Sequence, residues 1–369
     1  TLTGAVSSLL KANHVDVVCG TAVLASENAV QCGDMLYLAD RILLCGGSAP
    51  SLPPLPGMDG RDVVTSTELL NGETCPERLC ILGGGVIGCE LATVFRAFGS
   101  EVTIIEMAER IAPMFEKDIS EEVAGCLRKD GVQLMLHTRA EKIETLENGS
   151  SVVTDKGAVF CDTILVATGR RPELSCLGSL TDKIRLDNGR IAVNEYLETN
   201  IPGIYACGDI NGKLMLTHAA YYMGRIAAEN CLGARNKCRL DTVPNCMYAE
   251  PEVASVGLTE EEAVGKYGDR ICVGKFKLGA NGRAIAYGER AGFVKVVADK
   301  ITGELLGAHI VGPMANELIN EAVAVMESEM TIRELTSRVV HPHPSFSEAF
   351  YEACLDAQSI GLHLPPKKK

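Results

Sequence analysis

The chain has 369 residues, of which 46% are hydrophobic and 22% are charged, and its formal net charge is −13. At roughly 100–200 residues per domain, this length predicts two or three domains with separate cores. The negative charge excludes bulk binding to nucleic acid or to an anionic membrane, because both need a cationic protein surface. Small molecules and proteins are therefore the expected partners.

Neither a membrane span nor a signal peptide is expected. The longest apolar run, residues 79–95, contains several glycines and Glu90, unlike a span of ~20 lipid-compatible residues. The first residues lack the basic region of a signal peptide. The 15 cysteines are scattered, with no C-x-x-C spacing, which favours a reducing compartment. We expect a cytoplasmic protein.

The first quarter of the chain predicts short elements and then a linker. Residues 1–14 have a helical pattern, and short β-prone runs follow at Val15–Val18, Met35–Leu38 and Ile42–Cys45. These runs predict a small meander and a closing strand. The proline-rich stretch 49–57 interrupts regular structure and is the expected linker.

Residues 78–136 alternate between strand and helix patterns in the order βαβαβ, which is typical of a mononucleotide-binding half of a doubly wound sheet. Short strands are expected over 140–166, and an apolar helix over 219–232. From Pro244 onward, three strands precede two helices and predict an α+β domain. The terminal 361–369 is expected to be a disordered tail.

Three glycines form a G-x-G-x-x-G motif between the first strand and the first helix of the βαβαβ segment: Gly83, Gly85 and Gly88. Glycine permits the tight turn and lets a pyrophosphate approach the free N–H groups at the helix start. The plainer alternative is a glycine-rich turn kept for packing.

Two carboxylates accompany this motif. Glu106 ends the next strand, 23 residues after Gly83, where a carboxylate accepts hydrogen bonds from a ribose and repels a 2′-phosphate. This spacing predicts NAD rather than NADP. Glu90 lies in the first turns of the helix, where the helix dipole alone explains an acid.

Asp209 follows a strand in "GIYACGD". An acid at this end of a strand commonly binds ligand hydroxyls, and a simple helix cap is an equally good interpretation.

The stretch "VVHPHPSFSE" contains His341, His343 and Glu348. A metal site is disfavoured, because the prolines extend the segment and no further ligand has a fitting spacing. A turn in which Ser345 or Ser347 caps the next helix is one alternative. The other is that Glu348 orients His343 as a base that titrates near neutral pH. Such a base needs a thiol or another nucleophile to serve.

Cys75 and Cys80 have the C-x4-C spacing of a redox dithiol. Cys80 lies within a predicted buried strand, so we do not expect a redox role.

Together these segments resemble the pyridine nucleotide-disulfide oxidoreductase family, and the closing motif is similar to its dihydrolipoamide dehydrogenase branch. The resemblance extends over nearly the whole chain. It rests on these segments in this order: "ILGGGVIGCELA", "TIIE", "VATGRRP", "GIYACGD", "ELLGAHIVGP" and "HPHPSFSEAFYEA".

The resemblance implies an α/β fold with two doubly wound, Rossmann-like dinucleotide-binding domains, the first incomplete, and an α+β C-terminal interface domain that forms a homodimer. The implied domains are 1–75 (partial FAD-binding domain), 76–198 (NAD-binding domain), 199–243 (returning FAD-binding segment), 244–360 (interface domain) and 361–369 (tail).

It also implies the site residues. NAD is expected at Gly83, Gly85, Gly88, Glu90, Glu106 and Gly169. FAD is expected at Gly208, Asp209, Met215, Leu216 and Thr217. His343 is the implied acid/base and Glu348 its orienting carboxylate, acting on the active site of the partner subunit. No metal is expected.

The implied reaction is oxidation of dihydrolipoamide on a lipoyl carrier domain, with electrons passing through an enzyme disulfide and FAD to NAD. The implied setting is the E3 component of a 2-oxoacid dehydrogenase or glycine cleavage complex, in the cytoplasm of a bacterium or, as the alternative, in the mitochondrial matrix. Two departures stand out. The family's N-terminal FAD-pyrophosphate turn and C-x4-C disulfide are not expected in this chain, and "LLCGG" at 43–47 replaces the usual alanine-threonine-glycine strand end.

The missing segment has three interpretations: the chain is a fragment of a longer enzyme, the segment is a separate subunit, or the protein binds NAD and dimerises without catalysis. Another flavin disulfide reductase, similar to glutathione or mercuric reductase, is the alternative within the family.

Overall fold

The computed structural model describes residues 2–365, which form two compact units. The first unit comprises the residues up to Ala49 together with Arg170–Leu240, and the second comprises Pro50–Gly169 together with the residues from Asp241 onward. The last four residues of the predicted tail lie outside the described residues. Within residues 2–365, no helix combines the length and the hydrophobicity needed to cross a lipid bilayer.

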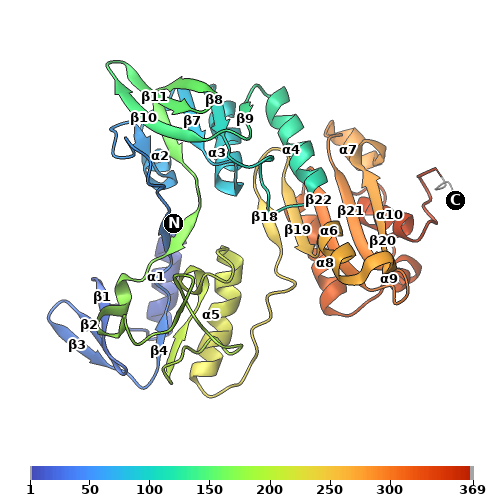
Figure 1. Cartoon of the computed structure of the whole chain (residues 1–369). Helices are drawn as coiled ribbons and strands as arrows, with labels where there is room; N and C mark the ends of the chain where they lie inside the picture. The colour runs from blue at the N-terminus through green and yellow to red at the C-terminus, as the bar shows by residue number, and fades with distance from the viewer. Residues whose placement is uncertain (1, 366–369) are drawn as a thin grey trace. The chain divides into compact units, whose positions relative to one another are not determined.

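Short elements build the first unit, and its strands come from both of its chain segments (Figure 1). They are α1 (Leu2–Ala12), β1 (Ala22–Ser26), β2 (Ala29–Cys32), β3 (Met35–Leu38), β4 (Ile42–Leu44), β5 (Ser48–Pro50), β14 (Arg170–Pro172), η1 (Ser175–Leu180), β15 (Leu186–Asp187), β16 (Arg190–Ile191), β17 (Ile204–Ala206), η2 (Gly208–Asn211) and α5 (Thr217–Cys231).

The parallel pair of β4 and β17 carries the core of this unit. Ile42 is opposite Ile204 and Leu44 is opposite Ala206, and all four side chains are buried. The predicted meander is present as the antiparallel sheet β1-β2-β3. The predicted helix 1–14 is present as α1, but the strand expected at Val15–Val18 is wrong. Val15, Val17 and Val18 are exposed on a coil, so β-branched residues there do not pack into a sheet.

The second unit begins with the predicted doubly wound segment, and its five-stranded sheet has the order β6-β13-β7-β8-β9. Its elements are β6 (Val63–Val64), α2 (Ser66–Asn71), β7 (Arg78–Leu82), α3 (Val86–Ala97), β8 (Glu101–Ile105), α4 (Lys117–Lys129), β9 (Gln133–Met135) and β13 (Thr163–Val166), with the antiparallel sheet of β10 (Ala140–Leu146), β11 (Gly149–Thr154) and β12 (Gly157–Cys161) inserted before β13.

The central strand β7 is parallel to both of its neighbours: Cys80 is opposite Ile164 of β13 and Thr103 of β8. Four of its five residues are buried, as expected for a strand covered on both faces. The predicted βαβαβ order of residues 78–136 is therefore confirmed.

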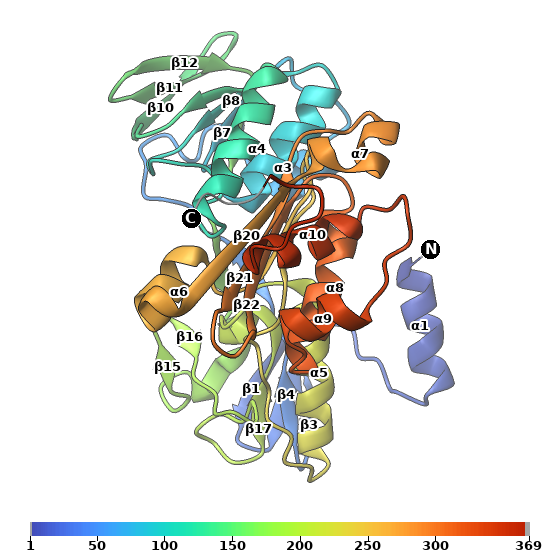
Figure 2. The same cartoon turned by 90° about the vertical axis from the view of Figure 1, so that its right-hand side faces the viewer.

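The rest of the second unit is an antiparallel sheet of order β18-β19-β22-β21-β20 with helices packed against it (Figure 2). Its elements are β18 (Asn245–Met247), β19 (Val253–Gly257), α6 (Glu260–Tyr267), η3 (Gly268–Arg270), β20 (Ile271–Lys277), η4 (Leu278–Ala280), α7 (Gly282–Tyr287), β21 (Phe293–Asp299), β22 (Leu305–Val311), α8 (Ala315–Glu327), α9 (Ile332–Arg338) and α10 (Glu348–Ala357).

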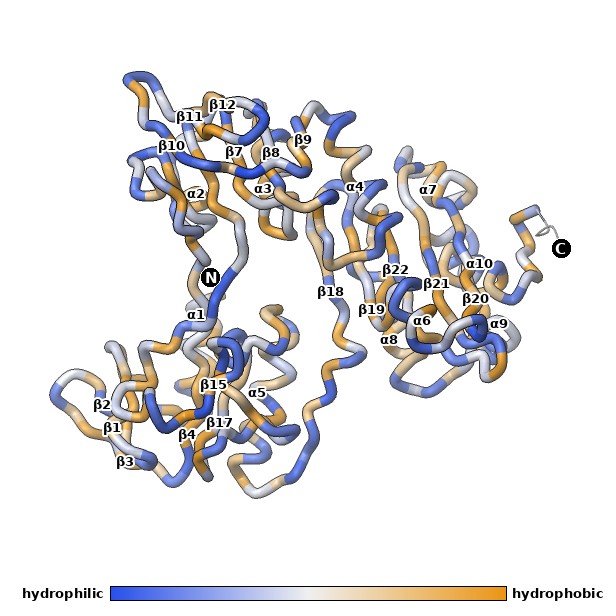
Figure 3. The backbone as a smooth tube through the Cα atoms, in the orientation of Figure 1, coloured by the Kyte–Doolittle hydropathy of each residue, from blue (hydrophilic) through white to orange (hydrophobic). Residues whose placement is uncertain are grey.

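Alternation along β21 separates two packing faces. Val294 and Val296 belong to the core formed with α8 and α10, whereas Val297 belongs to the cluster beside α6. Hydrophobic residues are concentrated along β19, β21 and β22 (Figure 3). Both faces of this sheet are therefore covered, which explains why β21 and β22 are buried along their whole length.

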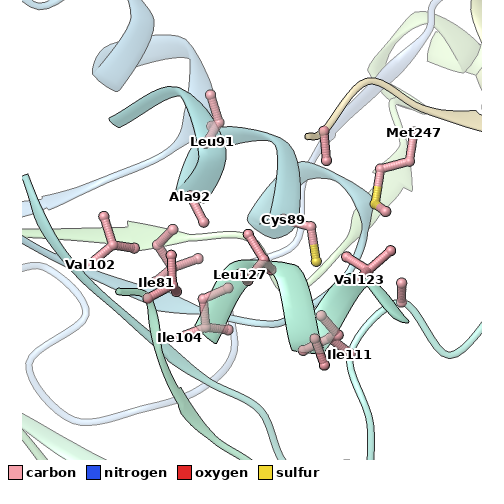
Figure 4. Close-up of a cluster of buried hydrophobic side chains, with 14 of the residues drawn as sticks. Ile81, Cys89, Leu91, Ala92, Val102, Ile104, Ile111, Val123, Leu127 and Met247 are labelled. Atoms are coloured by element: carbon pink, nitrogen blue, oxygen red, sulfur yellow. The ribbon is translucent and has the colours of Figure 1, made fainter. Parts of the chain in front are cut away.

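One hydrophobic cluster joins the doubly wound part to the antiparallel part. Met247 lies among side chains of α3 and α4 that include Cys89 and Val123 (Figure 4). Phe293 and Val311 belong to the same cluster. These two parts therefore share a core within the second unit.

Candidate active site and cofactor sites

The glycine turn between β7 and α3 has the geometry that its sequence predicts. Gly83 has φ +106°, and a Cβ there would lie 2.6 Å from the carbonyl oxygen of Ala167. A Cβ on Gly88 would lie 2.1 Å from the carbonyl oxygen of Gly83, so the helix packs directly on the turn. Gly85 is the N-cap of α3, without a side-chain cap, and a Cβ there would meet no atom within 4 Å. The turn thus leaves space and helix N–H groups for an anion.

Glu106 lies against this turn. One of its carboxylate oxygens accepts a hydrogen bond from the Gly84 N–H at 2.7 Å, and the other accepts one from the Ala108 N–H at 2.7 Å. Each oxygen can accept a further bond. The carboxylate is therefore held beside the glycine turn with capacity to bind ribose hydroxyls.

Glu90 has a structural partner that the sequence did not indicate. Its Oε1 accepts a hydrogen bond from the Tyr248 backbone N–H at 2.8 Å. Burial raises the pKa of Glu90, and this hydrogen bond opposes the rise. Glu90 thus connects α3 to the segment after β18, and its expected proximity to nicotinamide stays a prediction.

Gly169 follows β13 with φ +112°. Its carbonyl oxygen accepts a hydrogen bond from the Ser51 N–H at 2.9 Å, and a Cβ there would meet no atom within 4 Å. The residues predicted for NAD therefore fit a dinucleotide at the carboxyl ends of β7 and β8, through the open glycine turn and the held Glu106.

In the first unit, Asp209 lies shortly after β17 and is held by Ser48 of β5. Its Oδ2 accepts a hydrogen bond from the Ser48 hydroxyl at 2.6 Å. The Arg170 guanidinium donates to the Ser48 hydroxyl oxygen and to the Ser48 carbonyl oxygen, both at 2.7 Å. This chain of contacts orients the carboxylate, and a helix cap does not account for it.

The other residues predicted for FAD lie around the start of α5. Gly208 has φ +73°, and a Cβ there would lie 3.3 Å from the Cβ of Ala220. Leu216 is the N-cap of α5 and makes no side-chain cap. Met215 is half-buried and Thr217 is exposed. An oriented carboxylate near an uncapped helix start fits the hydroxyl and phosphate groups of FAD.

The predicted contact between His343 and Glu348 is present in the second unit. The Nδ1 of His343 is 2.8 Å from Oε1 of Glu348, and the Ser345 N–H donates to Oε2 at 2.8 Å. Burial opposes ionisation of Glu348, but the Ser345 N–H and the His343 ring outweigh it and lower the pKa of this carboxyl. Glu348 therefore stays an ionised acceptor for the ring.

The loop that carries His343 is anchored to α7. The Asn281 side-chain amide donates to the Ser345 carbonyl oxygen at 2.9 Å, while its oxygen accepts from the Ala284 N–H and caps α7. Phe346 packs edge-on against Tyr287, with ring centroids 5.5 Å apart. These contacts hold the loop while His343 itself is 78% exposed.

The alternative in which Ser345 or Ser347 caps α10 is wrong. Ser347 is the N-cap residue but makes no side-chain cap, and its hydroxyl lies 2.9 Å from that of Ser345. His341 also differs from His343: its side chain is 7% exposed, and its Nε2 is 2.6 Å from Oε1 of Glu321. The exposed histidine is thus His343.

Cys75 and Cys80 are not placed as a dithiol. Cys75 is exposed and its Sγ lies 3.3 Å from the Ser100 hydroxyl, whereas Cys80 is fully buried in β7. The neighbouring Cys161 thiol and burial raise the pKa of Cys80 well above its ordinary value.

The structure brings the predicted residues together in three separate groups. Glu106 lies against the glycine turn, Asp209 lies near the start of α5, and His343 contacts Glu348. Sequence reasoning missed Ser48, Arg170, Tyr248 and Asn281. Only Arg170 had a signal, since it stands in the quoted "VATGRRP".

Comparison with protein families supports this geometry. Residues 1–224 match the pyridine nucleotide-disulphide oxidoreductase model, and residues 243–354 match the dimerisation domain of the same family. The chain belongs to the pyridine nucleotide-disulphide oxidoreductase family. The predicted fold class is thereby confirmed.

Curated relatives of this oxidoreductase include two dihydrolipoyl dehydrogenases. The one from Bacillus subtilis (strain 168) is 36% identical over 366 residues, covering 97% of this chain and 79% of the relative. The mitochondrial one from Caenorhabditis elegans is 38% identical over 373 residues, covering 96% of this chain and 74% of the relative.

Solved structures give the same fold. The HOCl-induced flavoprotein disulfide reductase RclA from Escherichia coli has a TM-score of 0.87 and 29% identity, covering 95% of this chain and 83% of that one. LpdA from Mycobacterium tuberculosis has a TM-score of 0.87 and 27% identity, covering 95% and 79%. As a member of this oxidoreductase family, the protein is an enzyme that uses FAD and NAD, as the resemblance implies.

Proposed function

We propose that the protein catalyses the reaction dihydrolipoamide + NAD⁺ → lipoamide + NADH + H⁺. The observation that carries this proposal is the exposed His343 held by Glu348 at 2.8 Å. It occurs in a chain that is 36–38% identical to dihydrolipoyl dehydrogenases over 97–98% of its length. A thiol substrate needs a base of this type, since the thiolate is the reactive form.

In this proposal, the contact between His343 and Glu348 determines which ring nitrogen of the histidine takes the proton. Glu348 accepts the Nδ1–H of His343, which leaves Nε2 as the proton acceptor on an exposed ring. When Nε2 takes the proton of a dihydrolipoamide thiol, the ionised Glu348 stabilises the imidazolium. The same nitrogen can return that proton in the reverse direction.

The two other groups of predicted residues supply the proposed cofactor sites. The glycine turn of Gly83, Gly85 and Gly88 would hold the NAD pyrophosphate, with Glu106 on the ribose and Glu90 and Gly169 nearby. Asp209 and Gly208 would hold the ribityl chain of FAD, with Met215, Leu216 and Thr217 around the flavin. When bound, FAD accepts two electrons from a dithiol and NAD⁺ accepts a hydride.

The partners in this proposal are a second copy of the chain and a lipoyl carrier domain. Residues 243–354 match a dimerisation domain, and His343 would serve the active site of the partner subunit. The protein would act as the E3 component of a 2-oxoacid dehydrogenase or glycine cleavage complex. It would lie in the cytoplasm of a bacterium or in the mitochondrial matrix, since relatives of both origins match.

The test is His343→Gln in the FAD-loaded protein that contains this chain. Loss of the base lowers the rate of lipoamide-dependent NAD⁺ reduction by roughly 10²–10⁴-fold. Oxidation of NADH by ferricyanide does not use a thiol base and is retained. Both rates are read from the NADH absorbance.

A matched control is His363→Gln. His363 is also exposed and its Nδ1 is 2.6 Å from Oε1 of Glu352, but the proposal gives it no proton to transfer. Equal losses in both variants, or full activity of His343→Gln, would contradict the proposed role.

A second candidate is reduction of another disulfide, because the RclA structure is a flavoprotein disulfide reductase with a TM-score of 0.87 to this chain. Parallel assays with lipoamide and glutathione disulfide, each with NADH, separate the candidates. Turnover of glutathione disulfide without lipoamide turnover would select the second.

A further inference from the structure

Two cysteines follow the paired strands of the first unit and have no part in the proposed reaction. Cys45 comes directly after β4 and Cys207 directly after β17, whose register pairs Leu44 with Ala206. The Cys207 N–H donates to the Leu44 carbonyl oxygen at 3.1 Å, which continues that register. Adjacent strands lie about 4.8 Å apart, and disulfides join Cα atoms about 4.4–6.8 Å apart.

The two thiols already face each other. Their Sγ atoms are 3.4 Å apart and form a hydrogen bond. A disulfide bond of about 2.05 Å thus needs only a small further approach of the two sulfur atoms. No change of strand register is required.

The surroundings of the two thiols differ. Cys45 is exposed, whereas Cys207 is buried with 5% exposure. The hydrogen bond from Cys207 lowers the pKa of Cys45, although burial opposes this, and the same contact together with burial raises the pKa of Cys207. The more accessible sulfur is therefore also the one with more thiolate character, as in reactive thiols.

We propose that Cys45 and Cys207 form an oxidant-sensitive dithiol that small hydroperoxides convert to a disulfide. The Cys45 thiolate attacks the hydroperoxide ROOH, the O–O bond breaks, and with one proton the products are Cys45 sulfenic acid and ROH. The Cys207 sulfur then attacks the Cys45 sulfur, forming the S–S bond and releasing water. The cysteines lose two electrons in total and the hydroperoxide gains two.

The dithiol lies close in the sequence to Asp209, a residue predicted to bind FAD. Asp209 lies two residues after Cys207, and Ser48, its hydrogen-bond partner, lies three residues after Cys45. A disulfide would tether the two strand ends that carry this contact. The inference does not depend on the dihydrolipoamide reaction, because its readout is a covalent bond.

The test treats the reduced 369-residue chain with hydrogen peroxide at pH 7, blocks residual thiols with N-ethylmaleimide, and maps peptides by mass spectrometry without reductant. We expect a linked Cys45–Cys207 peptide that has lost two hydrogen atoms and that dithiothreitol separates. Cys75 is the internal control, because it is exposed but lies beside the Ser100 hydroxyl. It should stay available for blocking.

Three variants sharpen the result. Cys207→Ser should abolish the link and leave a Cys45 sulfenic acid that dimedone traps, and Cys45→Ser should leave Cys207 reduced. Cys176→Ser, which removes a half-buried neighbour, should keep the link. Circular dichroism melting curves verify that each variant is folded, and Cys45→Ala replaces Cys45→Ser if the serine variant is not.

The proposal is overturned if Cys45 becomes sulfinic acid without any linked peptide, or if it pairs with Cys176 instead. A second measurement is the alkylation rate with iodoacetamide at pH 7. We expect Cys45 to react at least about threefold faster than Cys207, because Cys45 is exposed and its pKa is lowered whereas that of the buried Cys207 is raised. Equal rates would also count against the proposal.

Discussion

At the scale of single residues, the key carboxylates are held by backbone N–H groups as well as by side chains. Glu106 accepts from Gly84 and Ala108, and Glu348 accepts from Ser345 and faces His343. Such bonds orient both acids, and in Glu348 they also lower the pKa of the carboxyl. The contacts of Glu106 with Ala108 and of Glu348 with Ser345 and His343 span at most five positions, whereas Glu106 and Gly84 are 22 residues apart.

The sequence could predict the contact of His343 with Glu348 because the two residues are five positions apart. It could not predict Asn281 or Arg170, whose hydrogen-bond partners are 64 and 122 residues away. Only the tertiary fold brings such pairs together. The catalytic and cofactor roles of the predicted site residues themselves stay predictions.

A residue-scale prediction concerns the choice of nucleotide. Glu106→Gln keeps the size of the side chain but removes the charge that, in the proposed NAD site, would repel a 2′-phosphate. The ratio of the Kd of NADPH to the Kd of NADH should fall by about tenfold or more, since apposed like charges cost several kcal/mol. Fluorescence titration of the chain with each nucleotide measures it.

Glu144→Gln is the control for this titration, because Glu144 is an exposed carboxylate paired with Lys142 on β10. Its ratio should match that of the parent chain. An unchanged ratio in Glu106→Gln would mean that Glu106 does not face the ribose.

At the scale of elements, the hydrophobic periodicity of the sequence predicted secondary structure correctly where the helices and buried strands are regular. It predicted β7, α3, β8, α4 and β9 in order. It missed β20, which is paired along seven residues with β21, because its lysines and glycine weaken the alternating pattern. It also missed α6, although Thr259 and Glu262 form a capping box that is readable in the sequence.

An element-scale prediction compares the same substitution in two helices. Gly88→Ala places a Cβ 2.1 Å from the Gly83 carbonyl oxygen, so α3 must move away from β7. Gly125→Ala, on the exposed side of α4, meets no atom within 4 Å. We expect Gly88→Ala to lower the free energy of unfolding by about 1–3 kcal/mol. Gly125→Ala should raise it by up to about 1 kcal/mol.

Urea unfolding followed by circular dichroism measures both variants. The two changes have the same chemistry, so opposite signs isolate the close approach of helix and turn. A stable Gly88→Ala protein would show that α3 does not need this contact.

At the scale of the molecule, ion pairs as well as a shared hydrophobic core connect the two parts of the second unit. The Lys295 ammonium on β21 is 3% exposed and lies 2.6 Å from Glu260 and 3.4 Å from Glu116. Burial alone would lower the pKa of Lys295, but the surrounding carboxylates raise it. Since Glu116 precedes α4, the ion pair links the doubly wound part to the antiparallel sheet.

Lys295→Met tests this link. It leaves the 6% exposed Glu116 carboxylate without its cation, and removing one partner of a buried pair costs about 3–5 kcal/mol. Lys142→Met removes a pair with Glu144 that is about half exposed, and should cost at most about 1 kcal/mol. Unfolding in urea gives both values, and equal costs would rule out a linking role for Lys295.

The division of the chain into units could not be read from periodicity. That the first unit resumes at Arg170 follows from the pairing of β4 with β17, and a local pattern carries no information about a partner strand so distant. The resemblance to the family, rather than the pattern, predicted a returning FAD-binding segment. Its predicted boundaries stay a prediction.

The pairing of β4 with β17 has a consequence for synthesis on the ribosome. Cys45 and Cys207 are 162 residues apart, and translation proceeds at about 5–20 residues per second. β17 therefore emerges from the ribosome roughly 8–30 s after β4. The doubly wound sheet, which lies between them in the sequence, emerges before β17. During that interval β4 lacks the strand with which it pairs in the folded unit, and unpaired strand edges are prone to aggregation.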